Sequence, residues 1–139
     1  MRFVFRVDVS SKMGSGHIMR CMTLAEKLRE IGASISFICR AHKGNLNHLV
    51  LNRGFQILEL KAPFKSKVID KSNVIKDDYS DWLGVSIDQD VHETIMAIGS
   101  EKPDWLIVDH YSLDFSWEKQ VRPFVKKIMV RPVTKRPPK

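Results

Sequence analysis

Residues 3–31 read FVFRVDVSSKMGSGHIMRCMTLAEKLREI, and this stretch decides the fold. Residues 3–9 are mostly apolar with incomplete alternation, which is typical of a strand buried in a parallel sheet. The polar, glycine-bearing segment 10–17 predicts a turn. Apolar side chains at helical spacing then predict a helix over about 18–31, with Gly32 as its C-terminal cap.

The same succession of strand and helix continues along the chain. We expect further strands over 34–39, 55–60, 105–108 and 127–130, and helices over about 45–54, 88–98 and 115–122. Strands that alternate with helices through short connections indicate a parallel sheet covered by helices. The predicted fold class is therefore α/β.

Two stretches depart from this pattern. Residues 61–87 are rich in Lys, Asp and Ser, and a long irregular stretch inside a compact domain is usually functional or mobile. The last nine residues, RPVTKRPPK, hold three of the six prolines and show no apolar periodicity. We expect a domain over 1–130 and a basic, proline-rich, disordered tail over 131–139.

The charge of the chain does not require a nucleic-acid partner. The formal net charge is +7, but the tail holds four of the 23 basic residues and none of the 16 acidic ones. Residues 1–130 are therefore only mildly basic, with both signs intermixed. A sugar-phosphate ligand or a solvated surface accounts for this as well as a polynucleotide would, and we expect no nucleic acid to bind.

Composition also bears on the compartment. The sequence has no apolar run of membrane-spanning length, and Arg2, Arg6 and Asp8 interrupt the N-terminal apolar stretch, so neither a membrane protein nor a signal peptide is expected. Cys21 and Cys39 each sit in an apolar pattern, which predicts reduced, buried thiols in a cytoplasmic protein. A disulfide or a pair of ligands is the alternative.

The turn Gly14-Ser15-Gly16-His17 is the strongest local signal for chemistry. Glycines let the backbone approach a ligand closely, and the N–H groups at the start of the next helix favour an anion. Met19 stands where a dinucleotide fingerprint has its third glycine, and no Gly-Lys-Ser/Thr follows as in a Walker loop. A plain structural turn is the alternative.

His17 is the candidate general base. At a helix N-terminus the dipole disfavours the imidazolium, so a neutral ring is expected there, at the edge of the sheet where open α/β folds keep their ligands. The alternative is a histidine at a helix start that bonds to a neighbouring carbonyl.

Asp109-His110-Tyr111 follows a later predicted strand and therefore lies at the same sheet edge. Asp and His suit sugar hydroxyls, and an aromatic ring suits an apolar sugar face, so we expect these three residues to bind substrate. Alternatively, Asp109 caps the next turn and Tyr111 packs. Tyr79, in the irregular stretch, is expected to reach over the same edge, unless it is anchored on the core.

A metal site is not predicted. The five histidines show no HExxH or similar spacing, and two cysteines cannot form a four-thiolate site. The sequence also has no GxSxG nucleophile motif.

Several motifs in order resemble the UDP-sugar hydrolases of pseudaminic acid biosynthesis, which cleave UDP-2,4-diacetamido-2,4,6-trideoxy-β-L-altropyranose. The likeness spans roughly residues 1–130. It rests on Arg6-Val7-Asp8, Gly14 to Cys21, Thr23-Leu24-Ala25, Phe37 to Arg40, Gly44-Asn45-Leu46, Asp78-Tyr79 with Trp82 to Val85, and Asp104 to Tyr111.

The resemblance implies a Rossmann-like domain that forms the N-terminal half of a GT-B fold. It implies attack of water at the anomeric carbon with inversion, releasing UDP and the free sugar, without a metal or an organic cofactor. His17 matches the general base of the family, and Tyr79 matches a tyrosine of the substrate cleft. Gly14, Ser15 and Gly16 match the turn against the diphosphate.

The chain departs from the family pattern after residue 130, where relatives continue into a second Rossmann-like domain that holds the uridine. We expect that C-terminal nucleotide-binding domain to be missing here, so no UDP-binding residues are assigned. Two interpretations stay open. The chain is the sugar-side domain of a hydrolase for the UDP-linked diacetamido-trideoxy sugar, or a non-catalytic α/β remnant that binds sugar phosphate weakly.

Overall fold

The computed structural model describes residues 1–11, 14–63 and 83–131. Within these residues, five strands form one parallel sheet in the order β3-β2-β1-β4-β5. The strands are β1 (Arg2–Val7), β2 (Ser34–Arg40), β3 (Gln56–Leu60), β4 (Trp105–Asp109) and β5 (Lys127–Val130).

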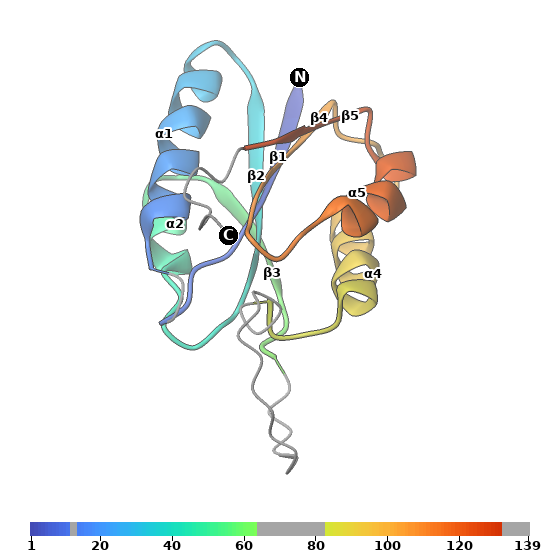
Figure 1. Ribbon diagram of the computed structural model, residues 1–139. Coiled ribbons are helices and arrows are strands. Elements are labelled where there is room, and N and C mark those ends of the chain that lie inside the picture. The colour runs from blue at the N-terminus through green and yellow to red at the C-terminus, as the bar shows by residue number, and fades with distance from the viewer. Residues whose placement is uncertain (12–13, 64–82, 132–139) are drawn as a thin grey trace.

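Helices cover both faces of the sheet (Figure 1). One face carries α1 (Gly16–Glu30) and α2 (Asn47–Asn52), and the other carries α4 (Ile87–Ile98) and α5 (Phe115–Val121), with a 3₁₀ turn over Arg122–Phe124. The predicted α/β class, a Rossmann-like parallel sheet with flanking helices, is confirmed.

The strand order places a topological switch point at the centre of the sheet. From β1 the chain winds outward through β2 to β3, then returns to β4 on the other side of β1 and ends at β5. The connection after β1 therefore runs to one face and the connection after β4 runs to the other. Open α/β sheets bind their ligands in the crevice that this reversal leaves at the carboxyl ends of the strands.

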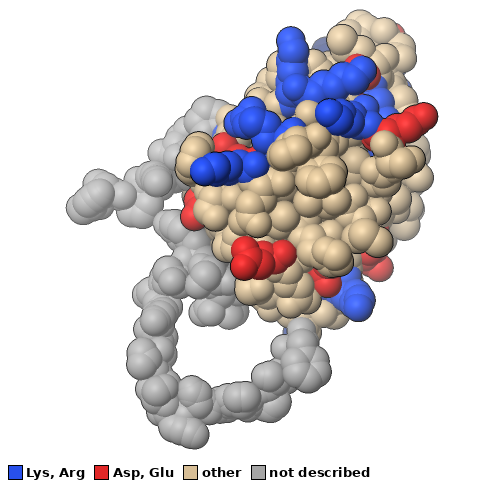
Figure 2. All heavy atoms as spheres, turned by 90° about the vertical axis from the view of Figure 1, so that its right-hand side faces the viewer, with Lys and Arg blue, Asp and Glu red and all other residues tan. Residues whose placement is uncertain are grey.

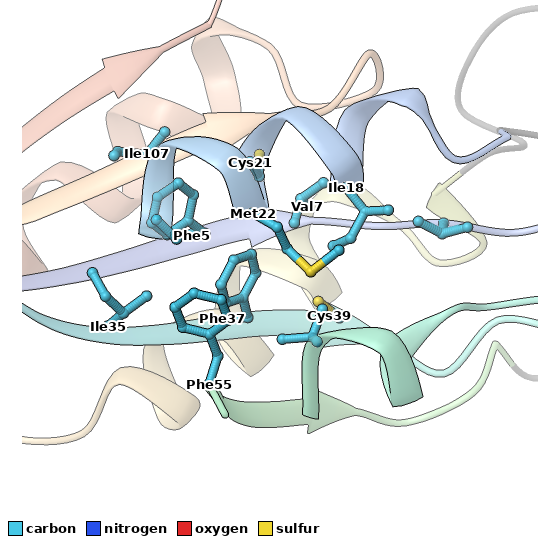
Figure 3. Close-up of a cluster of buried hydrophobic side chains, with 13 residues drawn as sticks. Phe5, Val7, Ile18, Cys21, Met22, Ile35, Phe37, Cys39, Phe55 and Ile107 are labelled. Carbon is cyan, nitrogen blue, oxygen red and sulfur yellow. The ribbon is translucent and has the colours of Figure 1, made fainter. Parts of the chain in front are cut away.

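The core between the sheet and α1 is aromatic and sulfur-rich (Figure 3). Phe5 stacks on Phe37 with ring centroids 4.8 Å apart, and Phe37 contacts Phe55 at 5.3 Å. Cys21 and Cys39 are buried free thiols in this core, as predicted. Burial raises the pKa of both thiols, so they stay protonated and behave as small apolar groups.

The core on the opposite face contains a buried ion-pair network. Arg6 of β1 and Arg40 of β2 are fully buried beneath α4, and both guanidinium groups donate to Asp90. The Asp90 carboxylate also accepts hydrogen bonds from Thr94 Oγ1 at 3.3 Å and Trp117 Nε1 at 2.9 Å. Because charges in an apolar core are costly unless paired, this network allows the central strands to be buried on both faces.

The element boundaries agree with the prediction to within two residues, and some of the small differences lie at the carboxyl edge of the sheet. Helix α1 begins at Gly16 rather than Ile18, so the Gly-Ser-Gly-His turn runs directly into the helix. Strand β4 continues through Asp109. The backbone N–H of Arg131 donates to Val108 O at 2.9 Å, so the ladder includes a residue predicted to belong to the tail. The structure does not describe Tyr79, Trp82 or residues 132–139.

Charged side chains are unevenly spread over the α4–α5 face. Most of the Lys and Arg gather toward the end at which the N-terminus lies in Figure 1, whereas Asp and Glu are scattered over the whole face (Figure 2). This basic end is opposite the edge where α1 begins. In the part of the chain that the structure describes, no helix combines the length and the apolar character needed to cross a membrane.

The buried network predicts a large cost for removing its central carboxylate. Asp90→Ala leaves two guanidinium groups buried without their shared partner, so we expect the free energy of unfolding to fall by about 3 kcal/mol or more. Urea denaturation measures this change. Asp88→Ala, in the exposed first turn of the same helix, is the matched control and should cost under about 1 kcal/mol. Equal losses in the two variants would contradict the role of the network.

Candidate active site

His17 lies at the second position of α1, immediately beside the switch point. Strand β1 ends at Val7, which pairs with Asp109 of β4 in the parallel register, and the turn after β1 brings the start of α1 back over this pair. The start of α1 and the end of β4 therefore meet at the sheet edge where the sequence predicted a site. About 12% of the His17 side chain is accessible, so the ring is largely covered but still reaches the surface.

A buried carboxylate holds the His17 ring. His17 Nδ1 is hydrogen-bonded to Asp109 Oδ1, and the Asp109 side chain has no exposed surface. Asp109 is the one hydrogen-bond partner of the ring among the residues described. Since an ionised carboxylate only accepts hydrogen bonds, Nδ1 carries a proton, and the neutral form of such a ring has its lone pair on Nε2.

Arg20 fixes the same carboxylate from one turn further along α1. Its Nε donates to Asp109 Oδ2 at 2.8 Å, and a terminal nitrogen donates to Oδ1 at 2.9 Å. This bidentate geometry defines the plane of the carboxylate as well as its position. Arg131 Nε lies 3.5 Å from Oδ2, and Cys21 Sγ donates a weak bond to the same oxygen.

These contacts keep Asp109 ionised. Burial by itself would raise the pKa of its carboxyl, but the hydrogen bonds and charges of His17 and Arg20 outweigh burial and lower the pKa to about 2. One carboxylate thus faces two guanidinium groups and an imidazole. The site consequently carries an excess of positive charge near the exposed turn over 14–16.

Tyr111 completes the surroundings of the histidine. Its ring meets the imidazole edge to face, with centroids 4.8 Å apart and an interplanar angle of 80°. Both residues come from the carboxyl edge of the sheet, one after β1 and the other after β4. Of the predicted site residues, the structure thus brings together His17, Asp109 and Tyr111.

His110 points to the opposite face and does not join this group. Its Nε2 bonds to Asp8 Oδ2 at 2.9 Å, and its Nδ1 accepts the backbone N–H of Ser112 at 3.0 Å. His42 Nε2 lies 3.2 Å from the same Asp8 oxygen. Because both ring nitrogens of His110 are engaged inside the protein, this arrangement leaves neither for the sugar hydroxyl that the sequence suggested.

Asp109 also differs from its predicted surroundings, because β4 extends through it and turns its side chain toward α1. The carboxylate lies beneath His17 and Arg20 instead of at the surface, where a sugar hydroxyl was expected to meet it. The alternative in which Asp109 caps the next turn does not occur among the described residues either, because the Asp109 oxygens accept from the side chains of α1. Asp114 caps α5 by accepting the Trp117 N–H.

The Gly-Ser-Gly turn is exposed, as a ligand-binding turn requires. Gly14 has a φ of 75°, which favours glycine, and its N–H closes a turn onto Ser10 O at 3.2 Å. Ser15 makes no side-chain capping bond and the first turn of α1 has no acidic residue. The N–H groups of this turn therefore retain their preference for an anion.

The loop after β2 supports this turn. Ser11 N donates to Lys43 O at 3.1 Å, and a Cβ on Gly44 would lie 2.7 Å from Ser11 N. A side chain at position 44 would push the two loops apart. This close approach explains a glycine at that position and helps to fix the connection into α1.

Sequence reasoning did not assign roles to Arg20 and Arg131. Arg20 follows His17 by three residues and therefore lies on the same side of a helix, a spacing that could have indicated its role. No local signal relates Arg131 to Asp109, which is 22 positions away and reached through the β4–β5 pairing. Among the described residues, no group of three or more His, Cys, Asp or Glu side chains could hold a metal ion.

Comparison with known proteins supports the resemblance expected from the motifs. No family model matches the chain. Over 122 residues the chain is 29% identical to the UDP-2,4-diacetamido-2,4,6-trideoxy-beta-L-altropyranose hydrolase of Campylobacter jejuni subsp. jejuni serotype O:2. The match covers 88% of this chain and 32% of the relative. The similarity to this hydrolase family is confirmed, and the chain spans about a third of the length of the relative.

The lowered pKa of Asp109 predicts a specific pH dependence of stability. The pKa of the Asp109 carboxyl falls from 3.8 to about 2 on folding. At pH values above the unfolded pKa, this shift stabilises the folded chain by roughly 2 kcal/mol. The contribution is lost as the pH falls through the folded pKa. The stability difference between wild type and Asp109→Asn should therefore shrink by about 1 kcal/mol from pH 6 to pH 3. Urea denaturation at the two pH values measures it. A stability difference that is the same at pH 6 and pH 3 would show that the partners of Asp109 do not lower its pKa.

Proposed function

We propose that this chain supplies the sugar-side half of a nucleotide-sugar hydrolase active site, with His17 as the general base. The observation that carries the proposal is the His17–Asp109 pair at the switch point. There a ring held at Nδ1 by a buried carboxylate reaches the surface beside an exposed glycine turn. The similarity to the Campylobacter hydrolase supports the same type of reaction.

The reaction is the hydrolysis of UDP-2,4-diacetamido-2,4,6-trideoxy-β-L-altropyranose. His17 Nε2 takes a proton from water as the water oxygen bonds to the anomeric carbon. The bond from that carbon to the phosphate oxygen breaks, and UDP leaves with the electron pair. Attack from the face opposite the leaving group inverts the anomeric centre and gives the free sugar.

The charge of the site supports an anionic substrate. Arg20 and Arg131 together exceed the single charge of Asp109, and Arg20 is 38% exposed at the side chain. The exposed backbone of Gly14, Ser15 and Gly16 lies at the start of α1, where N–H groups favour phosphate oxygens. We place the diphosphate of the substrate against this turn.

Aromatic side chains complete the proposed sugar site. Tyr111 stands edge to face with His17 and is half-buried beside it, so it is placed to contact the sugar ring near the attacked carbon. We assign Tyr79 to the same sugar site through the family motif. We propose no sugar contact for His110, because its ring nitrogens are bonded to Asp8 and Ser112.

A second domain is needed to hold the nucleotide. The relative is about three times as long as the matched region, and we propose that the present chain corresponds to the N-terminal half of a GT-B arrangement. The uridine and much of the leaving group then bind to the part of the relative that this chain does not match. The free thiols of Cys21 and Cys39 fit a cytoplasmic enzyme.

Release of UDP from the sugar nucleotide tests this proposal. The 139-residue chain is assayed alone and with an excess of the C-terminal part of the Campylobacter hydrolase. We expect turnover in the mixture and little or none from the chain alone, because positioning of the leaving group contributes much of the rate. His17→Ala should reduce the turnover of the mixture by about 10²-fold or more.

The control variant is His48→Ala, which removes an exposed histidine of α2 and should leave turnover unchanged. If the sugar nucleotide binds but is turned over neither by the chain alone nor by the mixture, the alternative of a sugar-phosphate-binding domain would be supported. Turnover of the His17→Ala mixture within about twofold of wild type would refute the assignment of the base.

A further inference from the structure

We propose that Asp109 is a positioning residue for His17 rather than a ligand of the sugar, and that Arg20 locks it in place. This inference rests on the proposed function, because it assigns a role in the same reaction. It extends that function from one histidine to a three-residue unit that spans α1 and β4.

The first argument is the saturation of the Asp109 carboxylate. Oδ1 accepts bonds from His17 Nδ1 and Arg20, and Oδ2 accepts bonds from Arg20 Nε and Cys21 Sγ. The side chain has no exposed surface. A sugar hydroxyl has neither access to these oxygens nor a vacant position on them, so the carboxylate acts through the groups that it already holds.

The second argument is the state of the ring that the carboxylate selects. A general base at Nε2 requires the proton of the neutral ring to reside on Nδ1. Asp109 accepts from Nδ1 and thereby favours this tautomer and fixes the rotation of the ring. In serine hydrolases an aspartate that bonds to the histidine in this way is worth orders of magnitude in rate, because its amide replacement selects the wrong tautomer.

The third argument is the rigidity of the supports. Asp109 is the last residue of β4 and pairs with Val7 of β1, while His17 and Arg20 share one side of α1. The ion pair therefore joins a central strand to the helix that packs on it. Arg20 binds both oxygens at 2.8 and 2.9 Å, which leaves the carboxylate little freedom to rotate away from the imidazole.

The Asp8–His110 pair on the other face shows by contrast what a general base needs. There too an aspartate bonds to a histidine, with a distance of 2.9 Å to Nε2. The second nitrogen of His110 accepts a backbone N–H, and its side chain is only 1% exposed. Of these two pairs, only His17–Asp109 leaves a ring nitrogen without a partner in the described residues and keeps the ring accessible.

Asp109→Asn tests the proposal in the mixture that turns over the sugar nucleotide. We expect kcat to fall by about 10²-fold or more while KM changes by less than about threefold, because the substrate does not touch the carboxylate. Asp104→Asn is the matched control. It removes the charge of a hydrogen-bonded aspartate at the opposite end of β4, and its kcat should match that of wild type.

A double variant separates positioning from a merely structural role. If Asp109 acts through His17, adding Asp109→Asn to His17→Ala should lower kcat by no more than about twofold further. Independent losses that multiply in the double variant would overturn the proposal. So would a single Asp109→Asn variant with kcat within about threefold of wild type.

A second measurement does not depend on activity. In ¹H–¹⁵N spectra of the histidine rings of the 139-residue chain, the neutral His17 ring should carry its proton on Nδ1, with His17→Ala identifying the signal. Asp109→Asn should move that proton to Nε2 in part or in full. A wild-type ring protonated on Nε2 would overturn the inference. Absence of turnover in the wild-type mixture would instead overturn the proposed function, and the spectra would still decide whether Asp109 holds the ring.

Discussion

The pairing of β1 with β4 at the centre of the sheet is the constraint on which the candidate site depends. Val7 and Asp109 are 102 positions apart in the sequence, and the parallel register of the two strands sets them side by side. Since β1 leads into α1 and β4 leads toward α5, the two connections leave the same edge for opposite faces. Sheets of this α/β type bind ligands in the space between two such connections, and His17 and Asp109 meet at that space.

The two faces of this edge use the same residue types for different purposes. Asp8 and Asp109 are both buried carboxylates at the ends of adjacent strands, and each bonds to a histidine. Burial works to raise the pKa of Asp8, but Arg6 and the bonds from His110 and His42 hold that pKa well below its ordinary value. Asp8 belongs to an interior network in which its partners are enclosed. Asp109 lies below a ring that reaches solvent, and this difference in exposure separates an enclosed pair from the pair that we propose for catalysis.

Buried charge is also what joins the central strands to α4. Arg6 and Arg40 occupy neighbouring strands on one face of the sheet, and Asp90 is the acceptor that they share. An apolar triad of similar volume could be as stable, but paired charges tolerate few alternative arrangements. The network thereby favours one register of β1 against β2 and one position of α4. Val7 is set level with Asp109 by the separate pairing of β1 with β4, in which β1 is the strand that both arrangements share.

The positions of strands and helices follow from the sequence because apolar periodicity and glycine are local signals. They located every strand to within about two residues and marked the turn at His17 as a place for chemistry. The residues near the edge were also predictable, since parallel strands end on a common side. The direction in which each side chain points was not predictable. Strand β4 is one residue longer than predicted, and with this extension Asp109 points to α1 and His110 points to Asp8.

The partnerships of charged residues are therefore properties of the tertiary structure alone. Arg6 in an apolar strand looks like an interruption until Asp90, 84 positions later, is seen to neutralise it. Arg131 looks like the start of a basic tail until the β4–β5 pairing brings it to Asp109. By itself the sequence determined the α/β alternation and the candidate base. Only folding decided which carboxylate holds that base, because an ion pair in a protein interior is selected by the distance between chain segments and not by their order.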